Sequence, residues 1–171
     1  LDILLAGSFS AKVYCRTAGT ANTAPAAPTG LALDVLGGRF TLSWNAATDS
    51  ETPAAGLTYN VRVGTTSNGV NVVSPMASPS TGFRRVPALG NANHRRTTVL
   101  GQLAEGTYYW SVQAIDTAFA GSPFASEATF SVCSISITPM SREIDAAGGS
   151  GTVDVTAAEG CLWGAASNAA W

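Results

Sequence analysis

Charged residues are scarce in this chain of 171 residues: lysine, arginine, aspartate and glutamate make up 12% of it, and the formal net charge is −2. That is about half the usual charged fraction. Such a chain lacks the strongly basic field that draws in nucleic acid. One local basic cluster, in a stretch rich in Gly, Pro and Asn without a nucleic-acid-binding motif, is interpreted as a solvated loop; it consists of Arg84, Arg85, His94, Arg95 and Arg96.

Histidine is nearly absent, which argues against a zinc site and against a Ser-His or Cys-His catalytic pair. His94 is the single histidine, and nothing beside it orients the ring for a Ser or Cys nucleophile. The Gly-Gly-Ser-Gly turn at 148–151 is no Gly-x-Ser-x-Gly elbow. Glu105, Asp116 and Glu127 are loop carboxylates without the facing arrangement that glycosidases need. We therefore expect no catalytic residue, no metal site and no cofactor.

The three cysteines, at positions 15, 133 and 161, fit no zinc-binding spacing. Cys133 and Cys161 flank a short β-rich segment and are able to pair, which would leave Cys15 over. A disulfide would place the protein in an oxidising compartment.

Long apolar runs are also missing, so the sequence predicts no transmembrane helix. Residues 1–6 are apolar but contain Asp2 and have no basic flank, unlike a signal peptide. The chain starts without Met and stops at Trp171 within a strand-like pattern. We expect it to be a fragment of a longer protein.

What the sequence does contain is segments in which apolar residues occur at every second position. In 108–115, Tyr108, Trp110, Val112 and Ala114 share one side, and Tyr109 points to the other; this predicts a strand with one buried face. The same pattern predicts strands at 31–33, 40–44, 57–63, 70–73 (a short edge strand), 97–100 and 129–132. Seven short strands without a helical stripe predict an all-β antiparallel sandwich of immunoglobulin-like type, with its core anchored by Trp44, Tyr59, Tyr108 and Trp110.

The segments Pro28-Thr29-Gly30-Leu31, Thr41-Leu42-Ser43-Trp44, Leu57-Thr58-Tyr59-Asn60-Val61 and 103–114 resemble a fibronectin type III domain. The resemblance covers nearly all of 25–132. It implies that Trp44 is the core tryptophan and that Tyr108 is the corner tyrosine, whose hydroxyl bonds back to the preceding turn. The region 64–99 is longer than in the family.

The flanks of this unit, which spans 30–132, are organised differently. Residues 21–29 form a Pro-bearing linker. Residues 1–20, with strand-like runs at 2–6 and 12–15, are similar to the end of an FG-GAP β-propeller blade. Of that family's calcium loop only Asp2 has a counterpart, so no calcium site can be built.

Residues 133–171 restart a β pattern. Ser136-Ile137-Thr138-Pro139, the 148–151 turn, Gly160-Cys161-Leu162-Trp163 and Ser167-Asn168 before Trp171 resemble the first part of a BACON domain, a β-sandwich module of secreted bacterial proteins. The resemblance implies a structural disulfide between Cys133 and Cys161. It also implies that Trp163 and Trp171 are core residues of that module.

Two loop features have alternative interpretations. Asp49 and Glu51 could hold calcium, but a solvated turn is favoured because calcium takes six to eight oxygens. Phe83, Phe119 and Phe124 lie in loops and could stack on sugars, but packing over the ends of the sandwich is favoured.

We expect a non-catalytic module of a secreted or surface-exposed bacterial protein that spaces and presents its neighbours and takes part in adhesion. The alternative is a carbohydrate-binding accessory region of a secreted glycan-degrading enzyme. The expected partners are neighbouring domains of the same chain, with glycans or surface proteins as alternatives; no nucleic acid and no membrane insertion are expected.

Overall fold

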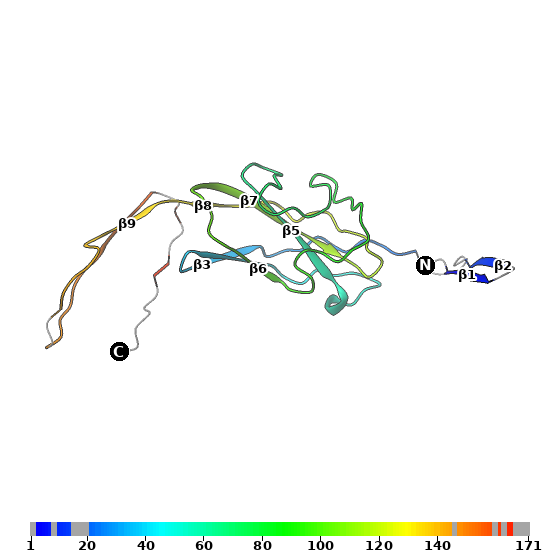
Figure 1. Ribbon diagram of the computed structural model, residues 1–171, viewed down its shortest axis with the longest axis horizontal. Coiled ribbons are helices and arrows are strands. Elements are labelled where there is room, and N and C mark those ends of the chain that lie inside the picture. Colours follow the sequence, from blue (N-terminus) through cyan, green and yellow to red (C-terminus); the bar gives the residue numbers. More distant parts are fainter. Residues whose placement is uncertain are drawn as a thin grey trace.

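Two three-stranded antiparallel sheets form the body of the molecule (Figure 1). The computed structural model describes residues 3–7, 10–14, 21–144, 147–158, 161 and 164–165. One sheet has the order β3 (Ala32–Leu36), β4 (Arg39–Ser43), β6 (Thr97–Leu100), and the other β5 (Thr58–Gly64), β7 (Gly106–Ile115), β8 (Ala128–Val132). The predicted all-β fold is confirmed, and a short 3-10 turn, Ala54–Gly56, is the helical element of the described residues.

The two sheets share one apolar core. All four predicted anchors are buried, and the Trp44 ring meets the Tyr59 ring edge-on at 5.7 Å between centroids. Phe130 of β8 stacks on Tyr108 at 5.3 Å. Each such aromatic buries roughly 150–250 Å² and so dominates the core. The Tyr108 hydroxyl donates to the Ala104 carbonyl at 2.9 Å, which confirms the expected bond to the preceding turn.

The prediction of one buried face on β7 was wrong for the second half of the strand. Ser111 and Gln113, on the side expected to face solvent, are fully buried, as is Asn60 on β5. Loop segments between β5 and β6 and after β7 cover this outer face. Gln113 Nε2 donates to the Ser122 carbonyl at 2.8 Å, and Ser111 Oγ donates to the Ala125 carbonyl at 2.6 Å. These bonds replace the water that an open sheet face would bind.

The expected edge strand at 70–73 is not formed. Val73 makes only an isolated bridge with Val63, and Asn93 makes another with Tyr59. Between the two bridges, the side chain of Asn91 takes the hydrogen bonds that an edge strand would make to β5. The edge of β5 is therefore closed by a loop, which protects it from pairing with another chain.

The 21–29 segment is bonded along one end of the sandwich. Its backbone joins the loop after β4, from Ala26 N to Thr48 O and from Asn45 N to Thr29 O, both at 2.8 Å. Asn22 Nδ2 donates to the buried Asp116 carboxylate at 2.7 Å. The predicted linker is thus held against the sandwich.

Two hairpins flank the sandwich and lie at opposite ends of it in Figure 1. They pair β1 (Ile3–Gly7) with β2 (Ser10–Tyr14), and β9 (Ile135–Thr138) with β10 (Asp154–Ala157). Among the described strands, neither hairpin contacts a sandwich strand. Several residues named in the predictions for the two flanks lie outside the described residues: Asp2, Cys15, Gly160, Leu162, Trp163, Ser167, Asn168 and Trp171.

Candidate functional site

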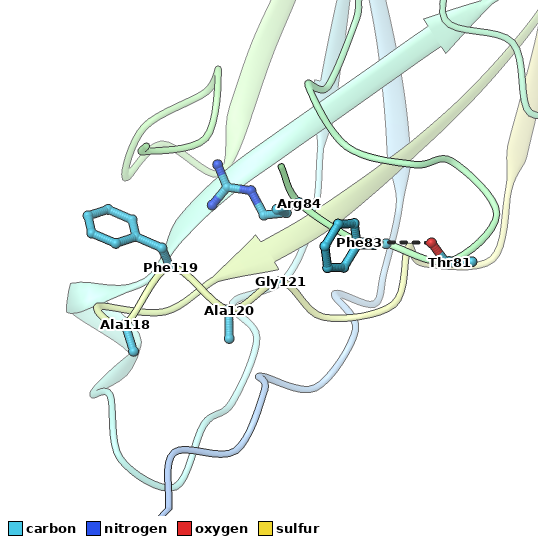
Figure 2. Close-up of a pocket in the computed structure, with 8 residues that line it drawn as sticks. Thr81, Phe83, Arg84, Ala118, Phe119, Ala120 and Gly121 are labelled. Atoms are coloured by element: carbon cyan, nitrogen blue, oxygen red, sulfur yellow. Dashed lines mark hydrogen bonds between the residues drawn. The ribbon is translucent and has the colours of Figure 1, made fainter. Parts of the chain in front are cut away.

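Phe83 and Phe119 line one surface hollow of about 580 Å³, together with Arg84, and come from two different loops (Figure 2). The Phe83 side chain is 66% exposed and Phe119 is 39% exposed. The favoured interpretation of packing over the sandwich was therefore wrong for Phe83. The close-up shows the Arg84 side chain between the two rings.

A tight turn fixes the backbone that carries Phe83. Gly82 N donates to Ser78 O at 2.8 Å, Ser78 N donates to Phe83 O at 2.9 Å, and the Thr81 hydroxyl accepts from Phe83 N at 3.2 Å. Gly82 has a φ of +70° and lies so close to the Ser122 carbonyl that a Cβ would collide with it. The turn is thus anchored on the sandwich, and it presents the ring outward.

Phe119 has an unusual backbone conformation. Its φ is 64°, in the left-handed region that costs a bulky residue roughly 1–2 kcal/mol. The turn is closed by Phe119 N to Asp116 O at 3.1 Å and by Ala120 N to the Asp116 carboxylate at 2.8 Å. A strained residue with an exposed ring is a feature of binding and switch sites.

Arg84 supplies the charge of the hollow. Its Nη2 donates to the Ala88 carbonyl at 2.5 Å, while Nε and Nη1 have no partner among the described residues. Burial lowers the pKa of Arg84, and the charge of Asp116 acts in the opposite direction. Arg84 is the charged side chain among the eight lining residues, and its Nε and Nη1 atoms are buried.

Phe124, the third loop phenylalanine, has a different role. Its ring lies 5.3 Å from the guanidinium carbon of Arg62, a cation–π contact. Arg62 is 2% exposed and pairs with Glu127 at 2.7 Å. Glu127 also accepts from Ser67 Oγ and from Asn68 N, both at 2.8 Å. The pair fixes the loop after β5 and was not foreseen from the sequence.

The side chains of Asp49 and Glu51, for which a solvated turn was favoured over a calcium site, bind protein donors. Asp49 Oδ1 accepts from the backbone of Glu51 and Thr52, and the Glu51 carboxylate accepts from Thr23 Oγ1 at 2.8 Å. Among the described residues, no three His, Cys, Asp or Glu side chains gather in a way that could hold a metal ion. Asp49 therefore closes its own turn, and Glu51 bonds that turn to the 21–29 segment.

The basic cluster does not form one surface of like residues. Arg84 is half-buried, whereas Arg85, Arg95 and Arg96 are exposed. His94 is also exposed, and its Nδ1 lies 3.0 Å from the Leu57 carbonyl. Glu105, which directly precedes β7, accepts a hydrogen bond from the Ser134 hydroxyl.

Cys133 and Cys161 are joined by a disulfide, with their Cα atoms 5.9 Å apart. The bond ties the segment after the β9–β10 hairpin to the residue that follows β8. No helix in the described part of the chain is long and apolar enough to cross a membrane.

Comparisons with known proteins do not assign this chain to a family. No family model and no curated protein matches the chain. One solved structure with limited likeness is the crystal structure of the Clostridium perfringens spore cortex lytic enzyme SleM, at 18% identity and a TM-score of 0.37. The match covers 63% of this chain and 28% of that one. A likeness at this level establishes neither fold nor activity.

Proposed function

We propose that the chain is a non-catalytic extracellular spacer of a secreted or surface-exposed bacterial protein, which holds the modules at its two ends apart and presents them for adhesion. The observation that carries the proposal is the separation of the two hairpins by the sandwich, whose strands neither hairpin contacts (Figure 1). The 21–29 segment is hydrogen-bonded to the sandwich, and the Cys133–Cys161 disulfide closes the segment that follows β8. A linker held against the sandwich suits a spacer, because a free linker would let the modules collapse together.

The carboxylates of the sandwich support a structural role. Asp49 closes its own turn, Asp116 holds both Asn22 and the turn at Ala120, and Glu127 neutralises the buried Arg62. Each is committed to a protein partner. The sheet order also supports the resemblance to a fibronectin type III domain, a sandwich type that commonly serves as a module in extracellular proteins.

Small-angle X-ray scattering of the whole chain tests the spacer function. We expect an elongated particle with a defined maximum dimension. A variant in which 22–29 is replaced by a Gly/Ser segment of equal length should give a broader distribution of dimensions, because the Asn22 side-chain bond to Asp116 and the stiff residues Pro25 and Pro28 are lost. A matched control replaces Gly37-Gly38, an exposed turn between β3 and β4, by Asn-Gly. A compact wild-type particle, or identical curves for wild type and the Gly/Ser variant, would contradict the proposal.

A second candidate function, carbohydrate binding, is favoured by one observation: the two exposed rings of Phe83 and Phe119 at the same hollow. Aromatic side chains on a shallow surface can pack against the C–H face of a sugar ring.

A further inference from the structure

We propose that the chain at Gly164 docks on the open edge of β3 and so joins the C-terminal module, residues 133–171, to the sandwich at a second point. The first point is the covalent chain that leads from β8 to β9. The inference rests on the spacer function and deepens it, because it names the joint that holds one of the spaced modules in place.

Strand β3 lies at the edge of its sheet, and one row of its backbone groups faces away from that sheet. The two-residue turn Gly37-Gly38, with φ angles of 57° and 74°, makes Leu36 and Arg39 the hydrogen-bonded pair that closes the β3–β4 hairpin. Bonded and non-bonded pairs alternate along an antiparallel ladder, so Val35 directs its N–H and C=O away from β4. Such edge groups are available for pairing with another segment of chain.

Gly164 lies at the outward carbonyl of Val35. A Cβ placed on Gly164 would be 2.7 Å from the Val35 oxygen, closer than real Cβ atoms approach a neighbour. The backbone of Gly164 therefore lies directly against the edge of β3, although the two residues are far apart in the sequence. The φ angle of Gly164 is outside the left-handed region, so the close approach of two backbones is what requires glycine here.

The Cys133–Cys161 disulfide confines Gly164 to the neighbourhood of β8. Cys133 directly follows β8, and its Cα lies 5.9 Å from that of Cys161. Gly164 comes three residues after Cys161, a span of at most about 11 Å. The tether gives Gly164 a high effective concentration near the end of β8.

The end of β8 and the Val35 end of β3 lie close together. Phe40 of β4 is the partner of Val35 in the sheet, and its ring stacks on that of Phe130 of β8 at 5.4 Å between centroids. Figure 1 shows both β3 and β8 at the end of the sandwich that faces β9. The tethered residue therefore reaches the β3 edge of its own chain more readily than a second copy does.

The two attachments of the C-terminal module are on different sheets. Strand β8 belongs to the sheet with β5 and β7, whereas β3 belongs to the sheet with β4 and β6. A module held by one covalent link can rotate about that link, and contact with the second sheet restricts this rotation. The contact also covers an unpaired edge, which removes a site for pairing between chains.

Nuclear magnetic resonance of the isotope-labelled full chain tests the docking. We expect a nuclear Overhauser effect between the α-protons of Gly164 and the amide proton of Val35. We also expect the amides of β9 and β10 to share the rotational correlation time of the sandwich. Gly164→Val should abolish the Overhauser effect and shorten the correlation time of the hairpin, because its side chain would collide with the Val35 carbonyl.

The matched control is Gly101→Val, at a glycine whose φ is also outside the left-handed region and where a Cβ would meet nothing within 4 Å. This variant should keep both signals. The double variant Cys133→Ser, Cys161→Ser should weaken the Overhauser effect, because the tether is lost. Melting within about 3 °C of wild type should show that each variant is folded, since the contact adds no side chain to the core.

The other outcomes contradict specific parts of the proposal. Absence of the Overhauser effect in wild type, or its persistence in Gly164→Val, would overturn the docking. An undiminished effect in the double variant would overturn the role of the tether. An effect found only between chains, in a mixture of labelled and unlabelled protein, would assign the β3 edge to a second copy.

Scattering judges the spacer function separately. An elongated particle without the Gly164 contact would overturn the joint and leave the spacer function standing. A compact particle that keeps the contact would overturn the spacer function and leave the joint standing.

Discussion

The side-chain amide of Asn91 pairs with both backbone groups of Val61. Its Oδ1 accepts from Val61 N at 2.8 Å, and its Nδ2 donates to Val61 O at 2.7 Å. A carboxamide has the same donor and acceptor as a peptide group, so one side chain takes the place of one residue of a neighbouring strand. The contact is possible because Gly90 lies directly against the Tyr59 carbonyl, where a Cβ would not fit.

Asn91→Ala should lower the free energy of unfolding by about 1–3 kcal/mol, because it leaves the N–H and C=O of Val61 unpaired beneath the loop. Urea denaturation measures this loss, and hydrogen exchange at the Val61 amide should become faster. The control is Asn71→Ala, which removes hydrogen bonds to Thr65 within an exposed turn and should cost less than about 0.5 kcal/mol. Equal losses for both variants would contradict the role of Asn91.

Alternation in the sequence was enough to predict the inner faces of β5 and β7. Tyr59, Val61, Tyr108 and Trp110 are apolar at every second position, and all are buried. Alternation is local, so it can be read from neighbouring residues. The hydroxyl bond of Tyr108 was instead implied by the resemblance to a fibronectin type III domain.

The burial of the outer face of the same strands could not be predicted. Asn60, Arg62 and Gln113 are polar and alternate with the core residues, which is the normal pattern of a solvent-exposed face. The loop segments between β5 and β6 and after β7 cover them, and alternation within a strand carries no information about such contacts. The backbone strain at Phe119 was hidden for a related reason: the turn is recognisable only once its φ angle is known.

Stability should fall on acidification because of Glu127. Burial raises the pKa of Glu127, but the hydrogen bonds from Asn68, Arg62 and Ser67 and the charge of Arg62 outweigh this and lower the pKa below its ordinary value of 4.5. A lowered folded-state pKa means that the contribution is complete above the unfolded-state pKa and is lost as the pH falls through the folded-state value. Urea titrations from about pH 7 to pH 3 should show the loss below about pH 4.5.

Glu127→Ala tests the same pair at neutral pH. Removing the carboxylate leaves Arg62 buried without its counter-ion and should cost about 3 kcal/mol. The variant should also lose part of the acid dependence of wild type. Glu105→Ala, at an exposed position, is the control and should change stability by less than about 0.5 kcal/mol. An acid profile of Glu127→Ala parallel to that of wild type would rule out Glu127 as the source.

Tyr108→Phe removes one hydroxyl and leaves the ring in the core. The lost bond to the Ala104 carbonyl should cost about 1 kcal/mol, which lowers the melting temperature by about 4–8 °C for a unit of this size. Tyr109→Phe changes the same group on the neighbouring residue, which lies on the half-exposed side and whose hydroxyl has no hydrogen bond within the described residues. Calorimetry should find Tyr109→Phe within about 1 °C of wild type. A larger effect at Tyr109 than at Tyr108 would be inconsistent with the corner role.

The disulfide predicts a definite thiol count. The Cα separation of 5.9 Å lies in the range that a disulfide spans, so protein unfolded without reductant should titrate one thiol, that of Cys15, and three after reduction. The double variant Cys133→Ser, Cys161→Ser should titrate one thiol in both conditions. Since the bond closes only the segment beyond β8, reduction should leave the melting of the sandwich unchanged and should speed proteolysis of the exposed 134–144 stretch. Three thiols before reduction would show that the bond is absent, and a fall in the melting temperature on reduction would show that the C-terminal module supports the sandwich.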